Sequence, residues 1–135
     1  MNIAVRYYTR SGNTKKLADA VAAATGAEAK DVSVPLAEKT DVLFLGCSYY
    51  AFDVDDAVKQ FIADNKENIG KIVCFGTSAM MKSMKKPVLN VAAPLGVAVS
   101  DEEFHCKGTF GPLHKGRPDA KDMAAAAEFA KKCCE

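Results

Sequence analysis

Hydrophobic and polar positions along this chain follow two different periods, and the shorter one predicts strands. Three runs that are almost wholly apolar predict strands: residues 3–8, 42–47 and 72–76. The run at residues 42–47 is typical of a central strand that is covered on both faces. A weaker alternation over residues 28–34 predicts an edge strand. Residues 96–100 predict a fifth strand, and residues 103–107 either continue it or form a neighbouring strand.

The longer period places apolar side chains every three or four positions and predicts helices. The first helix has Leu17, Val21 and Ala24 on one face, and Gly26 marks its end. The second helix is expected to have Asp53 as its N-cap. Its apolar face consists of Val54, Val58, Phe61 and Ile62.

Two further helices are predicted in the C-terminal half. A short one covers residues 88–93, after Pro87. The last one begins with Asp119 and with Asp122 three positions later, which is the spacing of a capping box. Its apolar face is expected to consist of Met123, Ala127, Ala130 and Cys134. Between these two helices, residues 108–118 are rich in glycine and proline and predict a loop.

This alternation of strands and helices predicts the α/β fold class. Because parallel strands joined by right-handed crossovers need helices on both faces, we expect a three-layer, doubly wound, five-stranded parallel sheet with strand order 2-1-3-4-5. The connection at residues 35–40 is too short for a full helix. We expect residues 1–135 to form a single domain, as the length suggests.

Composition and charge exclude several classes of protein. Hydrophobic residues make up 49% of the chain and charged residues 26%, which is typical of a globular protein and excludes a disordered one. A formal net charge of +1 argues against a strongly basic nucleic-acid-binding protein. No apolar stretch is long enough to cross a membrane, and the N-terminus does not resemble a signal peptide. We therefore expect a cytoplasmic protein with no nucleic-acid or membrane partner.

The five cysteines do not suggest a metal site. No C-x-x-C spacing is present, and only His105 and His114 could join cysteines as ligands. Cys47 and Cys74 lie in apolar runs and are expected to be small hydrophobic core residues. Cys133 and Cys134 are expected at a frayed helix end.

In an open α/β sheet of this order, ligands bind beyond the carboxyl ends of the strands, between the first and third strands. The loop after the first strand contains hydroxyl and amide side chains and one glycine before a helix: Thr9, Arg10, Ser11, Gly12, Asn13 and Thr14. The unpaired N–H groups of a helix N-terminus attract anions, so this loop predicts a phosphate site. Alternatively, Ser11 and Thr14 only cap the helix and Gly12 only makes the turn. The loop matches neither G-x-x-x-x-G-K-[ST] nor G-x-G-x-x-G, so a monophosphate fits best.

The segment YYTRSGNTKKLADAV resembles the phosphate-binding loop of the flavodoxin-like family, T/S-x-T/S-G-x-T. Thr9, Ser11, Gly12, Asn13 and Thr14 match that pattern position by position, and Arg10 stands at a variable position. The resemblance covers the whole chain and implies the flavodoxin-like fold of a short-chain member. It also implies FMN as cofactor, with its phosphate held by this loop.

The resemblance places two further loops beside the flavin. The loop after the third strand, expected against the isoalloxazine ring, contains Ser48, Tyr49, Tyr50, Ala51 and Phe52. These aromatic rings could instead cap the core or face a partner chain. The loop after the fourth strand, expected along the pyrimidine edge, contains Gly76, Thr77, Ser78 and Ala79, and Met80 and Met81 follow it. His105 and Lys107 come after the fifth strand, where an exposed role is favoured over contact with substrate.

Related folds with other chemistry do not fit these residues. A low-molecular-weight phosphatase needs C-x5-R, but Pro112 follows Cys106 and Asp53 follows Cys47 at the required position. A response-regulator receiver needs an aspartate where the third strand ends in Cys47. The G-x-S-x-G elbow of hydrolases is absent.

The favoured function is therefore that of an FMN-binding flavoprotein in electron transport, with a redox partner protein or a small electron acceptor. No side chain is expected to act as a catalytic acid or base. One alternative is a small NAD(P)H-dependent quinone or nitro reductase, an oxidoreductase of similar fold. The other is a domain of this fold that binds no flavin. Carriers of the family are usually acidic, and the net charge of +1 departs from that pattern.

Overall fold

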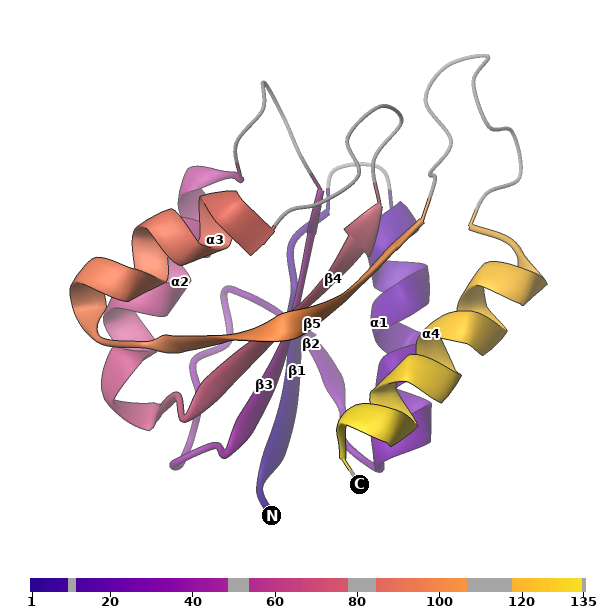
Figure 1. The fold of residues 1–135 in the computed structure, drawn as a ribbon, viewed down its shortest axis with the longest axis horizontal. Coiled ribbons are helices and arrows are strands. Elements are labelled where there is room, and N and C mark those ends of the chain that lie inside the picture. Colours follow the sequence, from indigo (N-terminus) through magenta and orange to yellow (C-terminus); the bar gives the residue numbers. More distant parts are fainter. Residues whose placement is uncertain (10–11, 49–53, 78–84, 107–117, 135) are drawn as a thin grey trace.

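The computed structural model describes residues 1–9, 12–48, 54–77, 85–106 and 118–134. Its centre is a five-stranded parallel sheet with the order β2-β1-β3-β4-β5 (Figure 1). The strands are β1 (Ile3–Tyr7), β2 (Ala29–Asp31), β3 (Val42–Ser48), β4 (Lys71–Thr77) and β5 (Ala98–Cys106). The predicted α/β class, strand order and parallel pairing are confirmed.

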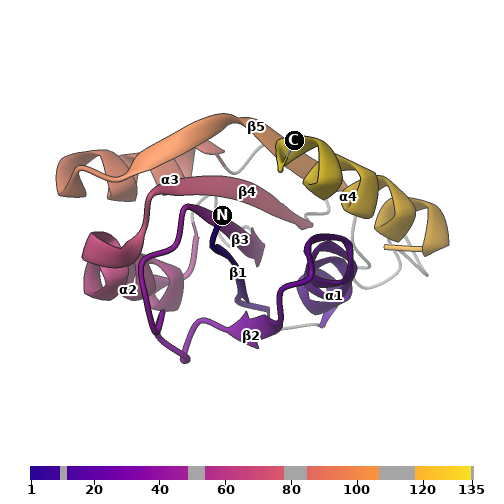
Figure 2. The ribbon, with the colours of Figure 1, turned by 90° about the horizontal axis from the view of Figure 1, so that it is seen from below.

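Helices cover both faces of the sheet and make three layers (Figure 2). On one face lie α1 (Asn13–Thr25) and α4 (Ala120–Cys133), and on the other lie α2 (Asp56–Asn65) and α3 (Lys85–Ala92). Short 3-10 helices, η1 (Lys66–Asn68) and η2 (Ala93–Leu95), follow α2 and α3. The doubly wound arrangement that was expected from the alternating elements is therefore present.

The side chains of β3 show how the apolar runs build two cores. Leu43, Leu45 and Cys47 face the core under α2 and α3, whereas Val42 and Phe44 face the core under α1 and α4. All five are buried, because successive residues of a strand point to opposite faces. The continuous apolar run at residues 42–47 is thus explained by burial of both faces.

Two helix boundaries follow the predicted signals and one does not. Gly26, with a φ of 76°, ends α1 in the left-handed conformation that glycine adopts without strain. Asp119 and Asp122 form the predicted capping box of α4. Asp53 was expected to cap α2, but the N-cap is Asp55, whose carboxylate accepts a hydrogen bond from the Ala57 N–H. Asp55 has an extended backbone, so the helix begins one residue later, at Asp56.

The capping box at the start of α4 is open to a direct test. Each aspartate accepts a backbone N–H of the other, at 2.9 and 3.0 Å. We expect Asp119→Ala to lower the free energy of unfolding by about 1 kcal/mol, because first-turn N–H groups lose their acceptor. Urea unfolding followed by circular dichroism measures the change. Asp56→Ala is the control, since its ion pair with Lys59 at 3.9 Å is solvent-exposed and only its charge at the start of α2 is lost, so the midpoint should fall by much less. An equal loss in both variants would contradict the assignment to the cap.

The edge strands depart from the prediction in length. Residues 28–34 were expected to form a strand, but β2 has only three residues and pairs with β1 from Val5 to Tyr7. Residues 103–107 were predicted to continue the fifth strand or to form its neighbour, and they continue it up to Cys106. The register of β5 on β4 shifts between the pairs Ile72–Val99 and Cys74–Glu103, so an irregularity accommodates extra residues within a single strand.

The connection between β2 and β3 contains no helix over residues 32–41, as its length predicted. In place of a helix, the guanidinium of Arg6, on β1, binds this segment by hydrogen bonds. Its Nε donates to the Val34 carbonyl at 2.9 Å, its Nη2 to the Pro35 carbonyl at 3.2 Å and its Nη1 to the Val5 carbonyl at 3.0 Å. Arg6 is only 6% exposed, and this burial lowers the pKa of its guanidinium, which nevertheless stays charged.

Candidate functional site

The carboxyl ends of β1, β3 and β4 lie at one edge of the sheet. Tyr7 pairs in register with Gly46, and two residues further on Ser48 pairs with Thr77. The carboxyl ends of these strands point toward the top of Figure 1. The described site residues of three separate segments therefore lie at one edge, as the strand order required.

The first turn of α1 keeps its backbone N–H groups directed toward this edge. Its N-cap is Gly12, which has a φ of 87° and no side chain that could cap the helix. A Cβ built on Gly12 would have no atom within 4 Å, so the space beside it is open. The Gly12 N–H donates to the Thr9 Oγ1 at 2.9 Å, which leaves the Thr9 hydroxyl hydrogen free for another acceptor. No acidic residue lies in this first turn, so its partial positive charge is not neutralised there.

The alternative in which Thr14 merely caps the helix does not fit its position. Thr14 is the second residue of α1 and is fully buried. Its Oγ1 lies 3.3 Å from the Oγ1 of Thr77, the last residue of β4, which is 3% exposed. The two hydroxyls form a buried hydrogen bond between the start of α1 and the end of β4.

A glycine of β3 makes this contact possible. A Cβ built on Gly46 would lie 3.0 Å from the Thr14 Cγ2 and 2.5 Å from two atoms of the Phe75 ring. Neither neighbour could stay where it is beside a larger residue. Gly46 therefore allows α1 to approach the sheet closely at the candidate site.

Lys15 is one of two lysines in the first turn of α1, and it has an acidic partner. The Lys15 ammonium lies 3.1 Å from the Asp19 carboxylate, one helical turn further on, and both side chains are more than half exposed. The hydrogen bond and the charge of Asp19 raise the pKa of Lys15. An anion at this edge would consequently meet backbone N–H groups and hydroxyls in the described part of the site.

Several predicted site residues lie outside the described residues. They are Arg10, Ser11, Tyr49, Tyr50, Ala51, Phe52, Ser78 and Ala79. The same holds for Lys107, His114, Met80 and Met81. Thr9, Gly12, Asn13, Thr14, Ser48, Gly76 and Thr77 are described, and all lie at or next to the carboxyl edge of the sheet.

His105 was expected after the fifth strand, in an exposed position. It lies instead within β5, is half-buried, and pairs in register with Gly76. The strand extends further than its sequence pattern indicated. After the irregularity, β5 pairs with β4 again, from Glu103 to Cys106.

Three cysteines, Cys47, Cys133 and Cys134, are poor nucleophiles. Burial raises the pKa of Cys47 well above its usual value. Burial, followed by the hydrogen bond to Glu102 at 3.1 Å, raises the pKa of Cys133 to about 12, and burial also raises that of Cys134. These thiols stay protonated at neutral pH. Cys47 and Cys74 are fully buried, as predicted.

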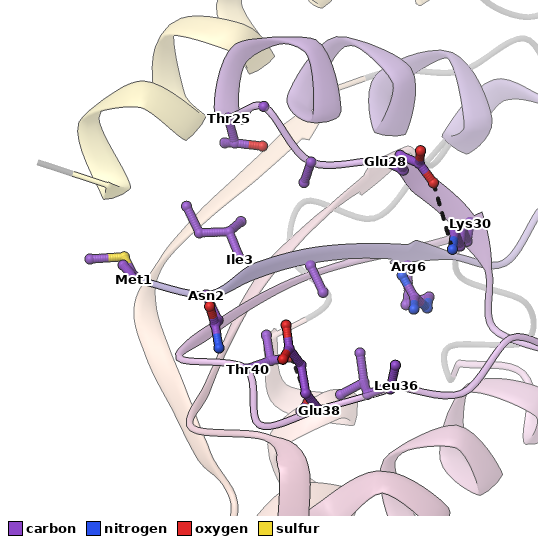
Figure 3. Close-up of a pocket in the computed structure, with 14 residues that line it drawn as sticks. Met1, Asn2, Ile3, Arg6, Thr25, Glu28, Lys30, Leu36, Glu38 and Thr40 are labelled. Atoms are coloured by element: carbon purple, nitrogen blue, oxygen red, sulfur yellow. Dashed lines mark hydrogen bonds and ion pairs between the residues drawn. The ribbon is translucent and has the colours of Figure 1, made fainter.

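A pocket of about 430 Å³ lies at the opposite end of the sheet (Figure 3). It is bounded by the start of β1, the turn after α1 and residues 36–40. Arg6 lines it, but its guanidinium already donates to three carbonyls. Lys30 lies 3.6 Å from Glu28, another residue of the rim. The pocket forms where β2 is too short to pair with Ile3 and Ala4, at the other end of the sheet from its carboxyl edge.

Within the described parts of the chain, no three histidine, cysteine or acidic side chains are grouped so that they could hold a metal ion. Likewise, none of the helices described is both long and apolar enough to span a bilayer.

Two residues that shape the structure were not recognised from the sequence as important. Gly46 interrupts an otherwise apolar strand, and an isolated glycine in a strand is a signal for close approach of another segment. Arg6 lies within an apolar run, and a buried guanidinium needs acceptors nearby. Both signals were present in the sequence, but they do not identify the segment that approaches Gly46 or the carbonyl groups that accept from Arg6.

Comparison with known proteins gives matches in structure alone. No family model and no curated protein matches the sequence. A flavodoxin from the domain Archaea has 14% sequence identity and a TM-score of 0.79, over 98% of this chain and 95% of that chain. The two-electron reduced flavodoxin of Megasphaera elsdenii has 19% identity and a TM-score of 0.65, over 96% and 98% of the two chains.

A third similar structure is a flavoprotein in complex with FMN from Lactobacillus acidophilus NCFM. It has 16% identity and a TM-score of 0.66, over 77% of this chain and 92% of that chain. At such identities the likeness establishes the arrangement of the elements and not the chemistry of the site. Together with the strand order 2-1-3-4-5 and four covering helices, these matches show that the chain has the flavodoxin-like fold.

Proposed function

We propose that this protein binds FMN non-covalently at the carboxyl edge of its sheet and transfers electrons. The observation that carries the proposal is the start of α1, where Gly12 replaces a capping side chain and Thr9 keeps a hydroxyl hydrogen available. Backbone N–H groups at a helix N-terminus, with nearby hydroxyls, are suited to a phosphate. Flavodoxins and a flavoprotein in complex with FMN share the fold and support the choice of ligand.

The described residues fit the phosphate end of such a nucleotide. Thr9, Gly12, Asn13 and Thr14 would surround the phosphate, and the open space beside Gly12 leaves room for it. Ser48, Gly76 and Thr77 would approach the rest of the ligand from the neighbouring strands. Tyr49, Tyr50, Ala51, Phe52, Arg10, Ser11, Ser78 and Ala79 complete the proposed site. FMN supplies the redox chemistry when bound, and the protein binds and orients it.

Titration of the flavin-free protein with FMN and with riboflavin tests this proposal. We expect flavin fluorescence to be quenched at micromolar FMN, and riboflavin, which lacks the phosphate, to bind more weakly. Thr9→Val should weaken FMN binding by about tenfold, since a hydrogen bond to a charged group is lost. Thr40→Val is the matched control, because the Thr40 hydroxyl also makes a hydrogen bond but lies at the opposite end of the sheet. Absence of FMN binding by the wild-type protein would refute the proposal.

The net charge of +1 supports a second candidate, an NAD(P)H-dependent flavin reductase of a quinone or nitro compound. A strongly acidic surface, which would steer a carrier to a basic partner, is missing from the overall composition. Anaerobic mixing of the FMN-loaded protein with NADPH separates the two candidates. Full bleaching of the flavin within seconds supports the reductase, whereas no reaction with NADPH, but reduction by light, supports the carrier.

A further inference from the structure

Arg6 carries a buried positive charge, and none of the described carboxylates forms an ion pair with it. The residue is 6% exposed, and its hydrogen bonds go to three neutral carbonyl groups. Burial lowers the pKa of the guanidinium, and no neighbouring negative charge raises it again. Because burial of an ion without a counter-ion is costly, such a guanidinium indicates that an anion completes its surroundings.

Two of the five N–H groups of Arg6 remain for such an anion. Its Nε, Nη1 and Nη2 atoms each donate once, to the carbonyls of Val34, Val5 and Pro35. Nη1 and Nη2 each carry a second hydrogen, which none of the described acceptors takes. A carboxylate can accept from both nitrogens at once, and this bidentate geometry gives strong and specific binding to arginine.

A second cation lies beside Arg6 on the wall of the pocket of about 430 Å³ (Figure 3). Lys30 of β2 pairs in register with Arg6 of β1. Both side chains point to the same face of the sheet, because Tyr8 and Val32, two positions further along each strand, pack in the core under α2 and α3. The Lys30 ammonium lies 3.6 Å from the carboxylate of Glu28, which is 84% exposed. Such an exposed ion pair is weak, so a ligand can compete for the ammonium.

The rest of the pocket limits the kind of anion that fits. Ile3 and Ala4 border it, because β2 is too short to pair with them, and Leu36 adds a further apolar side chain. Glu28 and Glu38 also line it, so a ligand with one negative charge is favoured over a multiply charged one. The volume is in the range of pockets that hold small organic molecules.

We propose that this pocket binds a small organic monocarboxylate. Its carboxylate accepts hydrogen bonds from Arg6 and Lys30, and its apolar part lies against Ile3, Ala4 and Leu36. Arg6 then has two roles, because three of its N–H groups hold the connection between β2 and β3 and the other two hold the ligand. The pocket is at the opposite end of the sheet from the proposed FMN site and does not depend on it.

Hexanoate and benzoate are suitable probes, because both combine one carboxylate with an apolar part. Hexanamide and benzamide have the same shapes without the charge. At constant ionic strength and up to tens of millimolar, we expect each carboxylate to raise the urea midpoint of the full chain, because a ligand that binds only the folded state stabilises it. Nitrogen-15 NMR should show the amide signals of Ile3, Ala4 and Leu36 shifting with added carboxylate. The two amides should have little effect on either measurement.

Variants of the two cations identify the contacts. Lys30→Met should weaken carboxylate binding about tenfold, since a hydrogen bond between charged groups is lost. Arg6→Lys should weaken it further, because a single ammonium cannot bind a carboxylate in the bidentate geometry. Lys59→Met is the matched control, since Lys59 also has a weak ion pair, 3.9 Å from Asp56, but does not line the pocket. This control should bind the carboxylates as the wild type does.

Four outcomes would overturn the inference. They are no response to either carboxylate, an equal response to the carboxylates and their amides, unchanged carboxylate affinity in Lys30→Met and Arg6→Lys, and a response to inorganic phosphate in place of the carboxylates. The third would show that Arg6 only holds the connection. If Arg6→Lys does not fold, as judged by its urea midpoint, Lys30→Met decides alone. None of these outcomes bears on the proposed FMN site, and failure to bind FMN would leave this inference standing.

Discussion

Gly46→Ala is expected to lower the free energy of unfolding by about 2–3 kcal/mol, a large effect for one added methyl group. The new Cβ would lie 2.5 Å from the Cε2 and Cζ atoms of Phe75 and 3.0 Å from the Thr14 Cγ2. Phe75 is fully buried in the core under α1 and α4, so its ring cannot turn out into solvent. Either the ring or the first turn of α1 must shift, and tightly packed interiors resist such shifts.

Urea denaturation of the wild-type and variant proteins measures this loss. The matched rescue is Gly46→Ala combined with Phe75→Leu, in which the smaller side chain makes room for the methyl group. Because the two residues are in contact, we expect the double variant to be more stable than the sum of the single effects. Gly26→Ala is a second control, since its Cβ meets no atom within 4 Å and only its positive φ is unfavourable. Additive effects of Gly46→Ala and Phe75→Leu would show that the clash is not the cause.

The same substitution should also weaken FMN binding if the proposed site is correct. Thr14, in the first turn of α1, packs against Gly46 of β3. A shift of this first turn would move the Thr14 hydroxyl and the nearby N–H groups together. Stability and affinity are therefore linked at this position. This link is a consequence of the close approach between α1 and the sheet, which any residue larger than glycine would prevent.

Most of the fold could be predicted from the sequence, because its signals are local. Burial on both faces explains the apolar run of β3, and Gly26 and the Asp119–Asp122 pair mark helix ends by their own backbone chemistry. The predictions were wrong where tertiary contacts, and not local sequence, determine the ends of an element. β2 is shorter than its alternation suggested, and β5 continues through an irregularity in its pairing with β4. The predicted N-cap of α2 was wrong because several aspartates near the start of that helix offer equivalent sequence signals. The structure has Asp55 at this position.

The candidate site was only partly open to prediction, because its geometry depends on contacts distant in sequence. The type of residue in the loop after β1 indicated an anion site. It did not indicate that Thr14 meets Thr77, or that Gly46 makes room for Thr14. Nor did it indicate the task of Arg6, which depends on how residues 32–41 return across the sheet edge. Sequence patterns give the face on which a residue lies, but the partner on that face comes from the packing.

Arg6→Met is expected to lower the free energy of unfolding by about 3 kcal/mol, because charge-assisted hydrogen bonds are lost and carbonyl oxygens near the core lose their donor. The methionine side chain fills much of the same volume and offers no N–H group. The carbonyls of Val34 and Pro35 are the acceptors that tie the helix-free connection to β1. Without the guanidinium, the middle of this segment would still be held by Leu36 in the core and by the hydrogen bond from the Leu36 N–H to the Asn65 Oδ1, at 2.9 Å. Backbone hydrogen bonds from Val32 to Tyr7 and from Thr40 to Asn68 would still hold its two ends.

Arg6→Lys separates charge from geometry at this position. Lysine keeps the positive charge, but a single ammonium cannot reproduce the fork of three donors to Val5, Val34 and Pro35. We therefore expect a loss of stability between that of the wild type and that of Arg6→Met. Lys30→Met is the matched control. Lys30 lies on β2, pairs in register with Arg6 of β1, and is exposed. Its removal should therefore change the urea midpoint little.

Hydrogen exchange locates the effect within the molecule. The amides of Val34 and Leu36 should exchange faster in Arg6→Met, because the connection opens locally before the sheet unfolds. The amides at the centre of β3 should keep the exchange rates set by global unfolding. If Arg6→Met and Lys30→Met had the same urea midpoint, the carbonyls would be satisfied by water and the connection would not depend on Arg6. Loss of protection across β3 as well as the connection would instead show that Arg6 supports the sheet, since the connection would not then open as a separate unit.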